Sequence, residues 1–416
     1  MLKIPIGNDT LNNMSRRFIV FQALNGSVYA LIQLSSVIAR KSLNASEFEV
    51  TILTIMMYLT AFTSIWWGWI IEGRDQRPFL LSAGLVGFLV VGSGIFLHSV
   101  NHLILIILVY YFATALFTPA QNRILQQHVS PQKQGIVFGI SQGAMMAVGA
   151  LISFLAGFWM DHHDYGYRHF FLTTAVLGTG GLLLFASIPS GQFMSRHRNK
   201  FRLLQPLVEA GRLLRRRKDF LRFEGAFMIY EFAYMMLLPV VPLYLVDDLQ
   251  ISYTTIGLAR GTVSQIVTIL AIILAGRLFD LSTPHRFAVY VFLILICHPL
   301  ALIAALPTAG LIRDLMIYLA FVIWGFAVGG LLMSWNLSSI RFAADEDAGV
   351  YQSVHYAAVT LRGIIAPFAG YAAMMQFGKP ITMAIISLLW LIAAAAMMLA
   401  RYFDLKSGAA PSLRAE

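Results

Sequence analysis

Apolar runs of about twenty residues recur from one end of this sequence to the other, and they restrict the fold more than any other feature. A helical run of that length crosses the ~30 Å hydrocarbon core of a bilayer. Only 12% of the residues are charged and 58% are hydrophobic, whereas soluble chains usually carry about 25% charged residues. The chain is therefore predicted to be a polytopic membrane protein.

Twelve such runs can be delimited, and each is predicted to be a transmembrane helix, because a helix satisfies its own backbone hydrogen bonds in lipid. The runs are too long and continuous for the alternating strands, about ten residues each, of an outer-membrane barrel. The expected fold class is thus an all-α polytopic membrane protein. The spans are residues 18–38, 48–71, 79–98, 103–122, 135–158, 170–190, 223–245, 253–275, 287–306, 314–336, 350–374 and 381–402.

The distribution of Lys and Arg predicts the orientation of these spans. If both termini and the loops after even-numbered spans face one side, that side carries 23 of the 30 basic residues, and the opposite loops carry 5. Cytoplasmic loops are enriched in Lys and Arg. Both termini are therefore expected in the cytoplasm, with the chain in a bacterial inner (plasma) membrane. The single cysteine, Cys297, lies within a span, which leaves no cysteine framework for a disulfide or a metal site.

The two halves of the chain resemble each other in three stretches. KSLNAS at 41–46 aligns with DDLQIS at 247–252, GWIIE at 68–72 aligns with GRLFD at 276–280, and the stretch from Gln121 aligns with that from Trp335. The offsets of 206, 208 and 214 residues grow slowly in chain order, so we interpret the chain as a duplication of six spans. The expected parts are an N-terminal tail (1–17), a first six-helix bundle (18–190), a basic linker (191–222), a second six-helix bundle (223–402) and a C-terminal tail (403–416).

The segment Ser195–Phe223, between the two halves, carries ten of the basic residues. Such a segment could bind nucleic acid or lipid headgroups, but a cytoplasmic linker needs the same charge under the positive-inside rule. The linker is the preferred interpretation, and no nucleic-acid partner is expected. Its portion LVEAGRLL (207–214) is expected to form an amphipathic helix on the membrane surface.

Twelve spans, cytoplasmic termini, a basic central loop and two similar halves resemble the major facilitator superfamily over essentially the whole chain. The superfamily signature G-x-x-x-D-R-x-G-R-R after the second helix corresponds to GWIIEGRDQR at 68–77, which keeps the glycine and an acid but lacks the second glycine and the arginine after the acid. The resemblance implies a cytoplasmic latch between two six-helix bundles. The alternative is a set of solvated loop charges. The candidate gate residues are Gly68, Glu72, Arg77, Gly276 and Asp280.

Four titratable residues stand out deep inside predicted spans, namely Glu231, Arg260, His355 and Arg362. A charge at bilayer depth costs at least ~2.5–3.5 kcal/mol, so intramembrane charges are functional candidates. From the cytoplasmic edge, Glu231 lies about 13 Å deep and Arg362 about 20 Å deep at 1.5 Å per residue, within reach of each other. The resemblance implies that helices 1, 4, 7 and 10 line a central cavity, flanked by helices 2, 5, 8 and 11.

Glu231 and Arg362 are candidates for a proton-coupling pair, similar to the helix 7 acid and helix 11 base of sugar–proton symporters. Burial raises the pKa of a carboxyl group and a nearby arginine lowers it, so separating such a pair would trigger proton uptake. His355 is a candidate relay, because histidine titrates near pH ~6.5. The alternatives are a structural ion pair that registers two helices and a histidine held by hydrogen bonds in a helix interface.

Neutral polar and aromatic side chains are expected to line the substrate cavity. With one acid and two arginines, such a cavity would suit an organic anion or zwitterion, although it could equally accept an amphipath. The duplication places Asn25 at the position equivalent to Glu231. Tyr110, Thr114 and Gln121 are expected toward helix 4. The candidate substrate-binding residues are Asn25, Gln22, Gln33, Tyr111, Asn122, Tyr230, Tyr234, Arg260, Trp335 and Asn336.

The sequence has no Walker loop, metal-ligand cluster or nucleophile elbow. No enzyme activity, catalytic residue, cofactor or metal is therefore expected. The predicted function is a proton-coupled secondary transporter of a small organic solute, working as a monomer by alternating access. Two alternatives stay open: an exporter or facilitator of amphipathic drugs or lipids, and a transporter-like membrane receptor that moves nothing.

Overall fold

The computed structural model describes residues 13–61, 63, 67, 75–129, 131–187, 205–343 and 348–407, and the regular structure in these ranges is helical. The first half contains α1 (Asn13–Leu43), α2 (Glu47–Ala61), α4 (Gln76–Gly92), the 3₁₀ turn η1 (Ser93–Phe96), α5 (Val100–His128), α6 (Pro131–His162) and α7 (Gly166–Ala186). The second contains α8 (Gln205–Arg216), α9 (Lys218–Leu243), α10 (Tyr253–Ile256), α11 (Ser264–Asp280), α12 (Pro284–Ala305), α13 (Gly310–Ala343), α14 (Ala348–Phe377) and α15 (Lys379–Lys406), with π-helical segments η2 (Tyr244–Asp248) and η3 (Gly257–Val263).

These helices follow the predicted spans closely. Within the described ranges, eleven helical segments are long and apolar enough to cross a membrane. The helix α2 begins the expected span 48–71, most of whose remainder lies outside the described residues. The helix α9 begins at Lys218, before the predicted start at 223, because the helix continues beyond the apolar run and carries basic side chains at its end.

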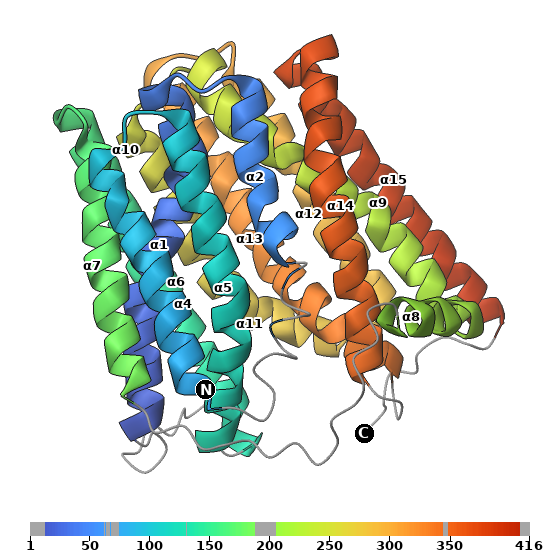
Figure 1. Cartoon of the computed structure of the whole chain (residues 1–416). Coiled ribbons are helices and arrows are strands. Elements are labelled where there is room, and N and C mark those ends of the chain that lie inside the picture. The colour runs from blue at the N-terminus through green and yellow to red at the C-terminus, as the bar shows by residue number, and fades with distance from the viewer. Residues whose placement is uncertain are drawn as a thin grey trace. The chain divides into compact units, whose positions relative to one another are not determined.

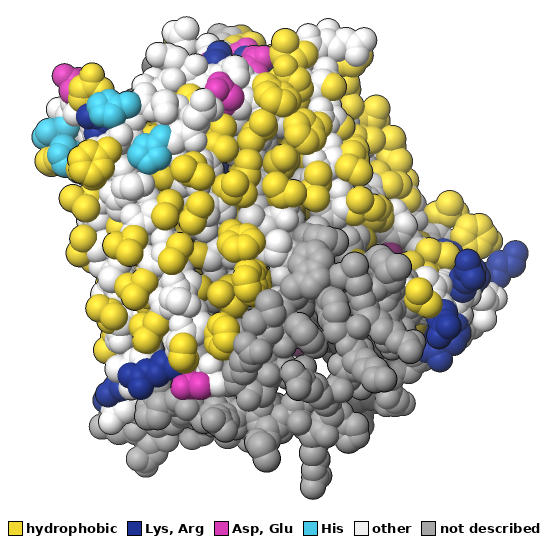
Figure 2. All heavy atoms as spheres, viewed as in Figure 1, with side chains coloured by type: hydrophobic (Ala, Val, Ile, Leu, Met, Phe, Trp, Pro, Cys, Tyr) yellow, Lys and Arg dark blue, Asp and Glu magenta, His cyan; other side chains and the backbone are white. Residues whose placement is uncertain are grey.

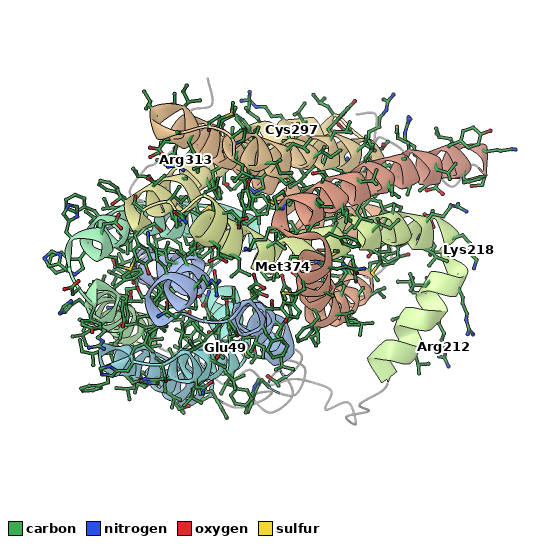
Figure 3. The ribbon with its side chains drawn as sticks, turned by 90° about the horizontal axis from the view of Figure 1, so that it is seen from above. Glu49, Arg212, Lys218, Cys297, Arg313 and Met374 are labelled. Carbon is green, nitrogen blue, oxygen red and sulfur yellow. The ribbon has the colours of Figure 1, made fainter. Side chains whose placement is uncertain are left out.

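The helix α8 is the amphipathic helix expected from LVEAGRLL. Figure 1 shows it lying crosswise to α14 and α15. In the view down the helices, Arg212 of α8 and Lys218 at the start of α9 point away from the rest (Figure 3). Leu213, the next residue of α8, is buried. An apolar inner side and a basic outer side agree with the predicted surface helix.

Contacts divide the chain into two compact units. Unit 1 comprises residues 1–45, 59–200 and 252–262, and unit 2 comprises 46–58, 201–251 and 263–416. The units follow the two sequence halves, except that each takes one segment from the other half. The two exchanged segments, 46–58 and 252–262, occupy equivalent places in the repeat. Each half therefore contributes the same part of its sequence to the other unit.

The same helix pairs form in each unit. In unit 1, α1 packs against α6 and α7, and α4 packs against α5 and α7. In unit 2, α9 packs against α14 and α15, and α12 packs against α13 and α15. Because α9, α12, α13, α14 and α15 are the repeat equivalents of α1, α4, α5, α6 and α7, the duplication extends to the packing.

The repeat is also visible in the backbone at its most similar stretch. Asn44 and Gln250, 206 residues apart, both have a left-handed conformation, with φ of 54° and 49°. Directly after them, the N–H of Ala45 and that of Ile251 each bond to the carbonyl six residues earlier, at 2.9 and 3.2 Å. The alignment of KSLNAS with DDLQIS therefore reflects one turn that occurs twice.

Large apolar side chains cover the outer faces of the helices. On α11, for example, Leu270, Ile273 and Leu274 are exposed. Over α4 and α7, hydrophobic side chains occupy the middle of the face, histidine and charged side chains lie at its upper end, and charged side chains lie at its lower end (Figure 2). Cys297 lies at the margin of the helices (Figure 3). An apolar band between polar ends is the surface of a multi-pass integral membrane protein.

Candidate functional site

Glu231 of α9 and Arg362 of α14 form an ion pair inside unit 2. Their side chains are only 2% and 1% exposed, so both charges are withdrawn from solvent. Removing two ions from water is costly, and only close pairing with good geometry offsets that cost. The structure thus brings together the acid and the base that the sequence pointed to, and a role in proton coupling remains a prediction.

A second polar pair lies on the same two helices. His355 Nδ1 of α14 lies 3.0 and 3.2 Å from the two carboxylate oxygens of Glu224 on α9, and both residues are buried. The sequence reasoning missed Glu224, because it is the second residue of the predicted span and resembles an edge charge. His355 Nε2 is buried and has no hydrogen-bond partner among the described residues.

The signal that could have revealed Glu224 is a spacing. Glu224 and Glu231 are seven residues apart, and so are His355 and Arg362. Seven residues are about two helical turns, so each pair of residues shares one helix face, about 10 Å apart. We name these two contacts the α9–α14 ladder, with an upper rung Glu231–Arg362 and a lower rung Glu224–His355. The ring of Phe227 contacts that of His355 edge-on, with centroids 5.3 Å apart.

Aromatic candidates gather beside the ladder in unit 2. Tyr234 stacks on Trp324 at 5.3 Å and meets Trp335 edge-on at 5.8 Å between ring centroids. Tyr230 lies next to Tyr234, with ring centroids 6.2 Å apart, and is completely buried. Asn336, by contrast, is exposed, and its amide donates to a carbonyl of its own helix. The structure therefore groups three of the four candidates expected in helices 7 and 10.

One group of candidates in unit 1 surrounds Tyr29. Gln33 donates a hydrogen bond of 3.0 Å to the hydroxyl of Tyr29. Arg260 and Tyr111 both interact electrostatically with the same hydroxyl. Arg260 lies in the π-helical segment η3, and such segments often occur at functional sites. Gln33, Tyr111 and Arg260 are thus brought together by a tyrosine that the sequence did not single out.

Two other candidates, Gln22 and Asn25, line a cavity of about 330 Å³ within unit 1. The cavity lies among α1, α4, α5 and α6, and Gln121 and Gln142 also line it. Gln142 was missed because the resemblance treats its helix as flanking. The side chain of Asn122, the remaining candidate, lies outside the described residues.

The candidate gate is described only in part, because Gly68 and Glu72 lie outside the described residues. Arg77 is exposed, and its N–H bonds to the Asp75 carboxylate at 3.0 Å. Gly276 and Asp280 lie near the end of α11. Within unit 2, Asp280 forms an ion pair of 3.3 Å with Arg341 of α13, which also donates to the Ser282 carbonyl at 2.6 Å. The latch remains a prediction.

Charged contacts hold the two exchanged segments in place. In unit 1, the Asp161 carboxylate accepts the N–H groups of Tyr253 and Thr254 at 2.9 and 2.7 Å, which caps the start of α10. In unit 2, Lys379 lies 3.7 Å from Glu47 and 3.0 Å from Asp248. No sequence motif indicates these contacts, since they join parts of the chain that belong to different halves.

Apolar helices of membrane length that enclose a buried acid–arginine pair and line a polar cavity are those of a polytopic membrane protein. The family model for the Major Facilitator Superfamily matches residues 18–367 and 225–414. The chain therefore belongs to this superfamily, a family of transporters, as its sequence suggested. Residues 225–367 fall within both matches, which agrees with two similar halves.

Solved structures of transporters share the fold. A bacterial homologue of the human lysosomal transporter Spinster, inward-facing and unoccupied, gives a TM-score of 0.72 at 15% identity, over 96% of this chain and 98% of that one. The nucleoside transporter NupG gives 0.67 at 14%, over 94% and 99%. The xylose transporter XylE from E. coli, inward open, gives 0.65 at 14%, over 92% and 94%. At these identities the likeness shows the fold alone. A comparison with curated proteins found no match.

Proposed function

We propose that this chain is a proton-coupled secondary transporter of a small organic solute that works by alternating access. The observation that carries the proposal is the upper rung of the ladder, an acid and an arginine paired within unit 2 and hidden from solvent. Intramembrane ionisable residues of this kind mark proton and substrate paths in transporters. The transporter names of the structural neighbours support a transport role.

The coupling follows from the chemistry of a buried carboxyl group. Next to a guanidinium the ionised form is favoured, and without that partner burial favours the neutral form. A movement of α14 against α9 that separates Glu231 from Arg362 therefore drives proton uptake, and renewed pairing drives release. Both helices belong to unit 2, so this movement is a rearrangement within one bundle that accompanies the rocking of the two bundles.

The lower rung extends the path toward the cytoplasm. With both termini in the cytoplasm, Glu224 and His355 lie about two turns closer to that side than Glu231 and Arg362. His355 has one ring nitrogen at Glu224 and the other without a partner among the described residues. Phe227 lies between Glu224 and Glu231 along α9, and its apolar ring packs beside His355. We therefore propose that a proton passes between the two rungs only in a later step, after α9 and α14 have moved.

The proposed topology places the chain as a monomer in a bacterial inner membrane with both termini in the cytoplasm. The ratio of 23 to 5 basic residues on the two sides supports this orientation. The sequence favours an organic anion or zwitterion as substrate because of its one acid and two arginines. In unit 2, however, Arg362 is already matched by Glu231, so the pair adds no net charge for a ligand.

Transport in reconstituted vesicles tests this function. A panel of sugars, nucleosides, amino acids and organic acids is screened by thermal shift, and the compound with the largest shift is followed in proteoliposomes. We expect an imposed pH gradient to stimulate uptake by the unmodified protein. Glu231→Gln should still exchange the compound across the membrane but ignore the gradient, because the amide cannot take up a proton.

The matched control is Asp314→Asn, which removes an acid at the start of α13, outside the ladder and the cavity. It should keep the response to the gradient. If Glu231→Gln keeps the same gradient dependence as the unmodified protein, the coupling role is wrong. Uptake that no gradient affects, combined with inhibition by amphipaths, would favour the exporter or facilitator instead. Binding without any flux would favour the receptor.

A further inference from the structure

The cavity of unit 1 is small and unusually rich in side-chain amides. Its volume of about 330 Å³ is at the lower end of the ~300–1,000 Å³ typical of small-molecule pockets. It therefore has room for a compound of one or two rings. The polar side chains that line it are Gln22, Asn25, Tyr110, Thr114, Gln121 and Gln142, and the aromatic rings are Phe21, Phe88, Phe117 and Phe138.

Gln22 indicates that the cavity is built for a ligand. Its side chain is only 5% exposed, yet the amide oxygen has no hydrogen-bond partner among the described residues. Its amide nitrogen donates to the Gln142 amide at 3.4 Å, which is a long bond. Buried polar groups in folded proteins are normally hydrogen-bonded. A ligand that donates a hydrogen bond would satisfy this oxygen.

The charge of the lining defines the class of that ligand. None of the described residues that line the cavity is an acid, a lysine or an arginine. An ionic ligand would lose its hydration there without gaining a counter-charge, which is strongly unfavourable. A neutral ligand avoids that cost. In this respect the cavity differs from the ladder of unit 2, where both rungs contain ionisable groups.

Carboxamides and hydroxyls suit one kind of neutral compound. Each carboxamide offers N–H donors and an acceptor oxygen, and each hydroxyl group of a ligand offers one O–H donor and an acceptor oxygen. The rings of Phe21 and Phe117, with centroids 5.5 Å apart, provide an apolar wall for the faces of a ring. We infer that the cavity binds a neutral ring compound with several hydroxyl groups and that the Gln22 amide is its principal hydrogen-bond partner. This inference rests on the proposed transport function, for which it names the substrate class.

Binding by the purified full-length protein tests the inference without any gradient. The probes are glucose, myo-inositol, uridine and adenosine, each beside a charged counterpart: glucuronate, inositol monophosphate, uridine monophosphate and adenosine monophosphate. At least one neutral probe should stabilise the protein in a thermal-shift assay and bind in calorimetry, and its counterpart should bind at least tenfold more weakly. The sugar, cyclitol and nucleoside arms distinguish the possible sources of the hydroxyl-bearing ring.

Two substitutions connect binding to the cavity. Gln22→Met keeps the side-chain length and removes the amide, and the second half already carries Met228 at the equivalent position. We expect at least tenfold weaker binding of the neutral probe for Gln22→Met and for Gln142→Met. The control Gln376→Met removes an exposed amide at the end of α14 and should bind as the unmodified protein does. Gel filtration checks that each variant is monodisperse, and Gln142→Met carries the test if Gln22→Met is not.

The outcomes separate this inference from the transport proposal. Tighter binding of the charged counterparts, no binding of any neutral probe, or neutral binding unchanged in the methionine variants would each overturn the inference. None of these results bears on Glu231, whose role is tested by the response of uptake to an imposed pH gradient. Conversely, neutral binding that depends on Gln22, together with transport indifferent to the gradient, would support the inference and refute proton coupling.

Discussion

The α1–α6 pair of unit 1 and the α9–α14 pair of unit 2 are equivalent in the repeat but differ in chemistry. The second pair has two polar rungs between its helices, whereas the first has a neutral interface at the same positions. Because α1 and α6 pack without an ion pair at these equivalent positions, the pair in unit 2 is not needed to hold the two helices in register, which favours the proton switch over the purely structural interpretation. The equivalent residues are Asn25 for Glu231, Val148 for Arg362, Phe18 for Glu224 and Ser141 for His355.

Close backbone approach holds the helices together in both units. A side chain added at Gly26 of α1 would collide with the Met145 carbonyl of α6. In unit 2 the glycine is on the other helix, since a side chain at Gly370 of α14 would collide with the Met236 carbonyl of α9. Small residues that let helix backbones approach are the usual basis of helix association in membranes. The polar rungs therefore add to a close backbone approach that both units share.

The largest expected effect comes from breaking the upper rung. Arg362→Leu leaves Glu231 buried without its arginine, and losing one partner of a buried ion pair costs ~3–5 kcal/mol. Val148→Ala, at the equivalent position of unit 1, removes only part of a half-buried apolar side chain and should cost about 1 kcal/mol or less. Thermal melting of the two purified variants in one detergent measures the difference.

A double variant shows whether the loss comes from the uncompensated charge. Glu231→Gln combined with Arg362→Leu removes both charges, so it should recover most of the stability that Arg362→Leu loses. If the double variant melts as low as Arg362→Leu alone, the two side chains do not act as a pair. The contrast between the units would then rest on packing and not on charge.

The lower rung, Glu224–His355, should contribute less to the stability of the protein than the upper rung does. His355→Phe keeps an aromatic ring but leaves the buried Glu224 carboxyl without this partner, which costs about 1–3 kcal/mol. Among the described residues, Ser141 bonds only to the Phe138 carbonyl of its own helix, at 2.7 Å, so Ser141→Ala should change stability by at most about 0.5 kcal/mol. Melting curves of the two purified variants measure the two losses of stability. Equal shifts for His355→Phe and Ser141→Ala would contradict the distinction between the units.

The helices could be predicted because apolar runs of membrane length leave few alternatives in lipid. Their ends were less accurate, as at Lys218, since a helix can continue past the apolar run that marks the bilayer. The acid and base of the upper rung were predictable because charges deep in a span are rare. Glu224 was missed because a charge beside the edge of a span is common and gives no signal by itself.

Features that depend on the packing of distant segments could not be predicted. The exchange of segments 46–58 and 252–262 between the units follows from contacts such as those of Asp161 and Lys379, which no local pattern encodes. The cavity likewise needs four helices to be placed before Gln142 faces Gln22. The repeat alignment predicted which residues are equivalent, but not which equivalent sites would be polar pairs and which a neutral cavity.

The smallest predicted effect concerns the turn that occurs in both halves. Asn44 and Gln250 are both exposed and left-handed, with φ of 54° and 49°, and Asn tolerates this conformation better than other residues with a side chain. Gln250→Asn should therefore stabilise the protein, and Asn44→Gln should destabilise it, each by about 0.5 kcal/mol, a fraction of the ~1–2 kcal/mol cost of a left-handed residue. Melting temperatures should shift in opposite directions. Shifts of the same sign would mean that the two turns, despite their equal geometry, do not respond to the same backbone preference.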